Sequence, residues 1–77
     1  KILYWFMKNK DELIYDLIFS DKVDFTINIS DYIENLYKYD RFINEIKTIL
    51  KKSKVDIIKE GVNIDIKSIT WRIKVNK

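Results

Sequence analysis

The segment IDIKSITWRIKV, residues 64–75, decides how the second half of the chain folds, because its alternation of apolar residues changes phase in the middle. Ile64 and Ile66 place apolar side chains at even positions, whereas the apolar side chains from Ile69 to Val75 stand at odd positions. A β-strand turns every second side chain to the same face. The phase change therefore requires either two strands or one strand that contains an extra residue.

We predict one long, bent strand from about Val62 to Val75, with a β-bulge at Lys67 and Ser68, because these two positions do not resemble a tight turn. The extra residue of a bulge shifts the register and restores the alternation on both sides. Trp71 is in phase with the isoleucines on either side of it. We therefore expect Trp71 to pack in the core and not against a partner.

The residues before this strand show alternating strand and helix patterns. The aromatic run ILYWFM is typical of a buried strand, and VDFTINI alternates as a strand with one buried face does. Two other segments carry apolar residues at helical spacing. The predicted elements are a strand at 2–7, a helix at 11–19, a strand at 23–29, a helix at 30–52, and a hairpin that joins 55–59 to the long strand.

Polar residues predict where these elements begin and turn. Asp11 is expected to cap the first helix and Ser30 the second. The segment 37–40 interrupts the second helical pattern, so we expect a kink or a short break there, with Asp40 suited to cap a new helix. Glu60-Gly61 contains the only glycine of the chain and is predicted to form a two-residue hairpin turn.

Together these elements predict an α+β fold. We expect a small two-layer sandwich in which strand, helix, strand, helix and hairpin follow one another, with helices on one face of a mostly antiparallel sheet. If residues 2–7 are helical instead, they join the first helix and the sheet loses a strand. With 77 residues and no visible linker or repeat, residues 1–77 are expected to form a single domain.

Composition excludes several kinds of chemistry. The chain has no Cys and no His, which removes thiol and imidazole nucleophiles and the usual ligands of zinc, copper and haem. One glycine cannot build a glycine-rich phosphate loop. We therefore predict a protein that is not an enzyme and holds no metal or cofactor. No apolar run is long enough for a membrane span and no signal peptide is evident, so a cytoplasmic location is expected.

Asp56 and the segment Asp65-Ile66-Lys67 stand on the two strands of the predicted hairpin. This arrangement resembles the metal-dependent nuclease motif of the restriction-endonuclease-like family. The resemblance implies that the two carboxylates hold Mg²⁺ and that Lys67 helps to activate water. The same residues are also the ordinary polar partners of isoleucine in an alternating strand, and a nuclease is kept as a remote alternative.

The charge is distributed unevenly along the chain. Residues 1–40 carry five basic and eight acidic side chains, whereas residues 41–77 carry ten basic and four acidic ones. A small basic nucleic-acid-binding protein is therefore the first alternative function. Lysines at a helix end also complement its dipole, and lysines on an outer strand hinder aggregation. The candidate phosphate contacts are Lys51, Lys52, Lys54, Arg72 and Lys74.

The aromatic residues favour a protein-binding function over these alternatives. A domain of 77 residues cannot bury all eleven aromatic side chains, and aromatic side chains supply much of the energy of interfaces. Tyrosines gather around the expected break in the second helix, next to an acid and an arginine. The predicted partner contacts are Tyr32, Tyr37, Tyr39, Asp40 and Arg41.

The favoured interpretation is a non-enzymatic module that covers a surface on a larger host protein or ribonucleoprotein complex. Ile and Lys supply 28 residues, which indicates an AT-rich genome such as that of a bacterium, a phage or another virus. Small, cofactor-free α+β proteins of this kind resemble, as a class, the phage-encoded anti-CRISPR inhibitors of host defence nucleases, which implies inhibition by occlusion. The opposite charges of the two halves and an open strand edge would also allow a homodimer.

Overall fold

The computed structural model describes residues 9–77, and within them the chain is a small α+β fold with two α-helices and a three-stranded antiparallel sheet. The strand expected at residues 2–7 lies outside the described residues. The elements are α1 (Lys10–Phe19), β1 (Asp24–Asn28), the 3₁₀ turns η2 (Ile29–Asp31) and η3 (Leu36–Lys38), α2 (Tyr39–Lys52), β2 (Asp56–Ile64) and β3 (Ile69–Asn76).

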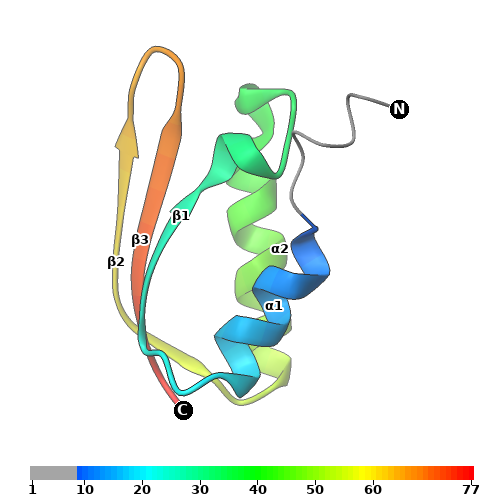
Figure 1. Cartoon of the computed structure of the whole chain (residues 1–77), viewed down its shortest axis with the longest axis vertical. Coiled ribbons are helices and arrows are strands. Elements are labelled where there is room, and N and C mark those ends of the chain that lie inside the picture. Colours follow the sequence, from blue (N-terminus) through cyan, green and yellow to red (C-terminus); the bar gives the residue numbers. More distant parts are fainter. Residues whose placement is uncertain (1–8) are drawn as a thin grey trace.

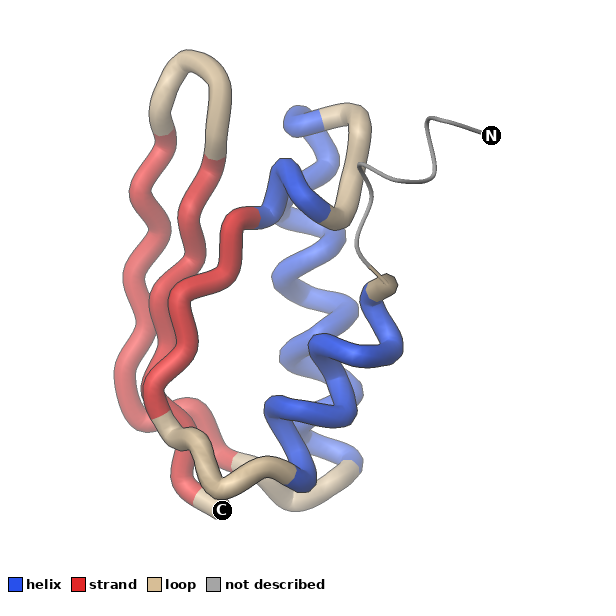
Figure 2. The backbone as a smooth tube through the Cα atoms, in the orientation of Figure 1, coloured by secondary structure: helices blue, strands red, loops and turns tan. Residues whose placement is uncertain are grey.

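The last strand of the chain is the centre of the sheet. The strand order is β1-β3-β2, and β3 pairs antiparallel with both neighbours. Both α-helices lie on one side of the sheet, and no helix of residues 9–77 covers the other side (Figures 1 and 2). The sheet therefore has an inner face that holds the core and an outer face that the described residues leave open.

The hairpin turn lies at a different place from the one predicted. β2 runs straight through Gly61, which lacks the positive φ that a two-residue Glu-Gly turn would need. The chain turns instead at residues 65–68, where the Asp65 N–H donates to the Ser68 carbonyl at 2.8 Å. The phase change in the sequence is thus a turn between two strands, and the predicted bulge at Lys67-Ser68 is wrong.

A register irregularity does occur in the sheet, but in β2. The pairing with β3 shifts between Ile57 and Lys59, which leaves Ile58 without a partner residue in β3. From Lys59 to the turn the hairpin keeps one register, whose last pair before the turn is Ile64 with Ile69. β2 is an edge strand, where irregularities of this kind are common.

The core lies between the inner face of the sheet and the helices. β3 alternates buried and exposed residues along its whole length, and Trp71 is fully buried, which confirms its predicted packing role. The predicted helical stripe around Leu13 and Leu17 is also confirmed. The buried residues are Leu13, Leu17, Phe25, Ile27, Ile29, Phe42, Ile43, Ile46, Leu50, Val55, Ile69, Trp71, Ile73 and Val75.

The predicted helix caps are wrong, for one shared reason. Asparagine side chains accept hydrogen bonds from the N–H two residues later, which starts a turn locally. Asn9 receives the N–H of Asp11 at 2.8 Å and caps α1, so Asp11 lies inside the helix. Asn28 receives the N–H of Ser30 at 3.2 Å, and that turn is a 3₁₀ turn that does not continue as an α-helix.

The second helix therefore starts later than predicted. Residues 29–38 form two 3₁₀ turns and a connecting loop, and α2 begins at Tyr39. The expected break near 37–40 is real but forms the start of the helix, with Asp40 in the first turn and not at the cap. Lys51 and Lys52 occupy the last turn, where cations favour the negative end of the dipole.

Neither helix of the described residues has the length and apolarity that a membrane crossing requires.

Candidate partner-binding cleft

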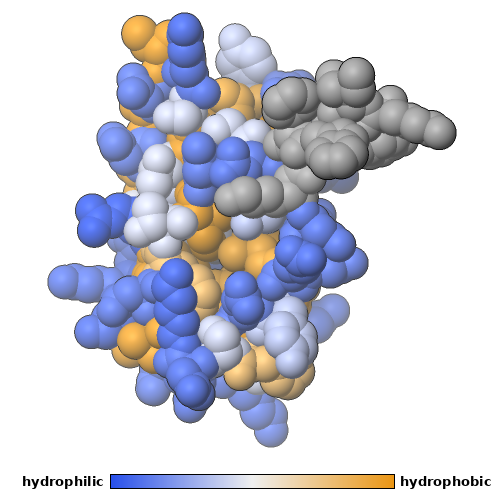
Figure 3. Space-filling view, in the orientation of Figure 1, coloured by the Kyte–Doolittle hydropathy of each residue, from blue (hydrophilic) through white to orange (hydrophobic). Residues whose placement is uncertain are grey.

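An open cleft lies between η3 and the tip of the β2–β3 hairpin. Its volume is about 610 Å³. The hairpin tip and the segment before α2 both lie at the upper end of the molecule (Figure 1), and apolar surface is visible at the hairpin tip (Figure 3). The lining residues are Glu34, Asn35, Leu36, Tyr37, Tyr39, Ile64, Asp65, Ile66 and Ile69.

One wall of the cleft is built by the η3 turn. The Asn35 side chain accepts the N–H of Tyr37 at 3.0 Å and holds the start of the turn. Tyr37 is thereby kept at the surface, 95% exposed. Leu36 and Tyr39 are half-buried and pack against the core. This wall therefore exposes the ring of Tyr37, while Leu36 and Tyr39 anchor the turn to the core.

The other wall is the hairpin tip. The Asp65 carboxylate accepts the N–H of Ile66 at 2.8 Å, within the turn that its own N–H closes onto Ser68. Ile66 is 93% exposed and Ile64 is 60% exposed. Ile66, at the tip of the turn, gains almost no burial from the fold of residues 9–77, because no core residue of that range covers it.

The charged residues that line the cleft are all acidic. Glu34 and Asp65 are its only charged lining residues, and neither forms an ion pair with another residue in 9–77. The cleft thus combines an apolar floor with carboxylates. Such a surface complements an apolar segment that carries Lys or Arg.

The predicted partner contacts do not all lie together. Tyr37 and Tyr39 share the cleft, as predicted from their position at the break. Tyr32 stacks on Phe42, with ring centroids 5.7 Å apart, and is half-buried. Asp40 and Arg41 are exposed in the first turn of α2 but do not line the cleft.

The predicted phosphate contacts are also divided between two places. Lys51, Lys52 and Lys54 are exposed at the end of α2, on the helical side of the molecule. Arg72 and Lys74 alternate with buried residues of β3 and therefore point to the open outer face of the sheet. The five residues do not form one basic face.

The position of the turn separates the residues of the nuclease-like arrangement in space. Asp56 begins β2 and Asp65 follows its end, so the nine residues of the strand separate them by up to about 30 Å at roughly 3.3 Å per residue. Two ligands of one Mg²⁺ must each lie within about 2.1 Å of it. Residues 9–77 contain no group of three acidic, Cys or His side chains that could hold a metal ion.

Ile64 and Ile66 were missed as site residues because a single bulged strand was predicted across them. The phase change itself was the signal: two strands out of phase place a turn, and hence an exposed isoleucine, between them. A second exposed pair, Tyr15 and Phe19 on α1, was missed as well; their ring centroids lie 5.0 Å apart.

Comparison of the chain with protein-family models, with curated proteins and with solved structures found no match.

Proposed function

We propose that this chain is a small protein-binding module that holds an apolar, Lys- or Arg-bearing segment of a larger protein in the cleft between η3 and the hairpin tip. The observation that carries the proposal is that Tyr37 and Ile66 line the same cleft from two separate segments and that both side chains are almost fully exposed. Both side chains would become buried only in a complex.

The energetics of such a complex favour these two positions. Tyrosine is enriched among the residues that dominate interface energies, and burying an isoleucine contributes roughly 1.5–3 kcal/mol. Tyr39 and Leu36 line the same cleft and already pack against the core, so little ordering is needed when a partner binds. The carboxylates of Glu34 and Asp65 would steer a basic partner toward the cleft.

The class of partner follows from this chemistry. Proteins that handle nucleic acids carry basic surfaces that neutralise phosphates. An acidic, apolar cleft suits the occlusion of such a surface, which agrees with the composition-based hypothesis of a phage-encoded inhibitor of a host nuclease complex. That identity stays a prediction from composition and size.

Site-specific photo-crosslinking tests the proposal. A photoreactive phenylalanine analogue replaces Tyr37 in one sample and Tyr15 in another, and each is irradiated in a lysate of the host organism. Tyr15 is the matched control, because it is also an exposed tyrosine but lies on α1 outside the cleft. We expect discrete crosslinked proteins from position 37 that position 15 does not give.

A second pair of variants makes the test quantitative. Ile66→Ser should weaken binding of the crosslinked protein at least tenfold, whereas Ile58→Ser, at an isoleucine that is also well exposed but lies in β2 away from the cleft, should leave it unchanged. Equal effects of the two substitutions, or identical crosslinks from positions 37 and 15, would contradict the assignment of the cleft.

A further inference from the structure

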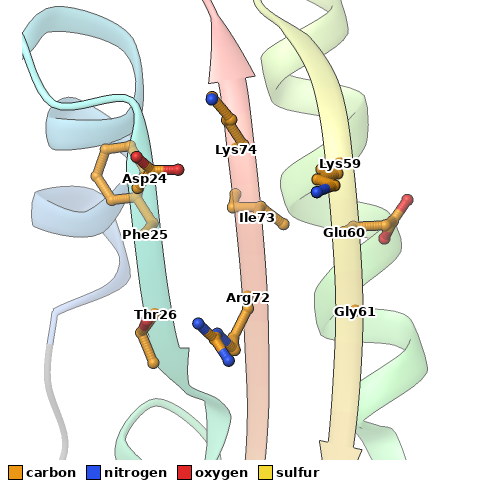
Figure 4. Close-up of a pocket in the computed structure, with 9 residues that line it drawn as sticks. All are labelled: Asp24, Phe25, Thr26, Lys59, Glu60, Gly61, Arg72, Ile73 and Lys74. Carbon is orange, nitrogen blue, oxygen red and sulfur yellow. The ribbon is translucent and has the colours of Figure 1, made fainter.

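A groove crosses the outer face of the sheet, on the side away from the helices (Figure 4). Its volume is about 530 Å³. It shares no lining residue with the cleft at the hairpin tip. Three strands contribute to it: β1 with Asp24, Phe25 and Thr26, β2 with Lys59, Glu60 and Gly61, and β3 with Arg72, Ile73 and Lys74.

The cations of this groove repel one another in the folded chain. Lys59 and Lys74 are direct partners across β2 and β3, and like charges in this position are unfavourable. Arg72 lies two residues from Lys74 on the same face of β3. None of the three forms an ion pair within residues 9–77.

The carboxylates near the groove offset these cations only in part. Asp24 is the cross-strand partner of Lys74 on the β1 side and offsets one of the three positive charges. Glu60 lines the groove only with its backbone side, because its carboxylate points to the helices and pairs there with Lys47 at 2.7 Å (Figure 4). The groove keeps a net positive charge that an anion would stabilise.

The middle of the groove is left open by a glycine. Gly61 is the cross-strand partner of Arg72, and a Cβ placed on Gly61 would meet no atom of the described residues within 4 Å apart from its own chain neighbours. Glycine weakens a strand, so this residue is unfavourable for the sheet itself. Its effect is to leave the Arg72 guanidinium accessible from the β2 side. On the β1 side Arg72 faces Thr26, a short polar residue.

We propose that this groove binds the phosphates of a nucleic-acid backbone, through Lys59, Arg72 and Lys74. This face, which no helix of residues 9–77 covers, suits an extended polyanion, and backbone contacts of this kind need no base recognition. The described residues that line the groove include no exposed aromatic ring on which bases could stack, which favours binding without sequence preference.

Fluorescence anisotropy with a labelled single-stranded oligonucleotide, and with its duplex, tests the proposal. Three phosphate contacts on a single strand predict a salt dependence of about −2 in log K against log salt, which is a loss of roughly 20-fold between about 50 and 200 mM. The nucleic acid that binds more tightly identifies the form of the backbone. Binding of neither at about 50 mM salt overturns the proposal.

Two triple variants locate the binding site. Lys59→Gln with Arg72→Gln and Lys74→Gln should abolish the salt-dependent binding. Lys51→Gln with Lys52→Gln and Lys54→Gln removes the same charge from the end of α2 and should retain most of it. Circular dichroism verifies that both variants are folded. If the α2 variant loses as much affinity as the sheet variant, net charge and not the groove is responsible, and the proposal is wrong.

Discussion

The indole N–H of the buried Trp71 donates a hydrogen bond to the Oε1 of Glu60, 3.3 Å away on the neighbouring strand. The other carboxylate oxygen of Glu60 pairs with Lys47 of α2 at 2.7 Å. One carboxylate thus satisfies the polar atom of the largest core residue and links the sheet to the helix. Glu60 lies inside β2, where its side chain faces inward, because the chain turns at residues 65–68 and not at Glu60.

We expect Glu60→Ala to destabilise the fold by roughly 1–2 kcal/mol, because the indole N–H of Trp71 loses its acceptor in a partly buried position. Glu60→Gln keeps an acceptor and loses only the ion pair with Lys47. Both partners of that pair are more than a third exposed, so its loss should cost less than about 1 kcal/mol. Urea unfolding measures both values, and equal losses would show that the indole bond contributes nothing.

Lys77 completes the end of α1. No basic residue stands in the last turn of this helix, and the Lys77 ammonium donates to the carbonyls of Asp16 (3.1 Å) and Ser20. A cation at a helix C-terminus contributes about 0.3–1 kcal/mol. Lys77→Met should lower stability by that amount, whereas Lys67→Met, at an exposed lysine of the hairpin turn, should not. Thermal melts of the two variants at low salt make the comparison, and equal melting temperatures would contradict the capping role.

Gly61→Thr should affect stability and anion binding in opposite directions. The backbone of Gly61 has no positive φ and there is free space around its Cα, so threonine fits and favours the strand by about 0.4–1 kcal/mol. The same side chain stands beside Arg72 in the outer groove and should weaken binding of an oligonucleotide. Thermal melting and anisotropy are measured on one sample. A stabilised variant with unchanged binding would show that the open groove does not serve phosphate binding.

Substitution of Tyr37 and of Tyr39 distinguishes a side chain that contacts a partner from a side chain that supports the fold. Tyr37→Ala should leave stability within about 0.5 kcal/mol, because its ring is almost fully exposed. Tyr39→Ala should cost roughly 1–3 kcal/mol, since this ring packs against the core. Denaturant melts test both. A stability loss on Tyr37→Ala would indicate that its ring supports the fold, and it would remove the argument for an interface.

Apolar periodicity predicted the elements whose pattern is regular. Leu13 and Leu17 marked the helix face of α1, alternation marked β1, and Trp71 was correctly placed in the core. These predictions succeeded because burial of one face is what the pattern records. The same reasoning placed Tyr37 and Tyr39 near a break, where they do share a cleft.

Local polar chemistry was predicted less well. Several residues can cap a helix, and the sequence does not show which one does: Asn9 and Asn28 act where Asp11 and Ser30 were expected. The rule that glycine marks a turn failed at Gly61, because this residue lies inside a strand and leaves space on the outer face of the sheet. The division of the basic residues between α2 and the sheet depended on the strand order, which periodicity does not reveal.

The turn that joins β2 and β3 gives the last prediction. Ile66 and Lys67 stand at its tip, between Asp65 and Ser68, and neither has the positive φ that suits a two-residue hairpin. Ile66→Asn with Lys67→Gly supplies the preferred type I′ turn, keeps the register of Ile64 with Ile69, and should stabilise the hairpin. The variant also removes the most exposed isoleucine of the cleft. We therefore expect a higher melting temperature together with weaker binding of the protein that crosslinks at position 37. If binding is retained in this more stable variant, the isoleucine at the tip is not part of the interface, and its exposure has another cause.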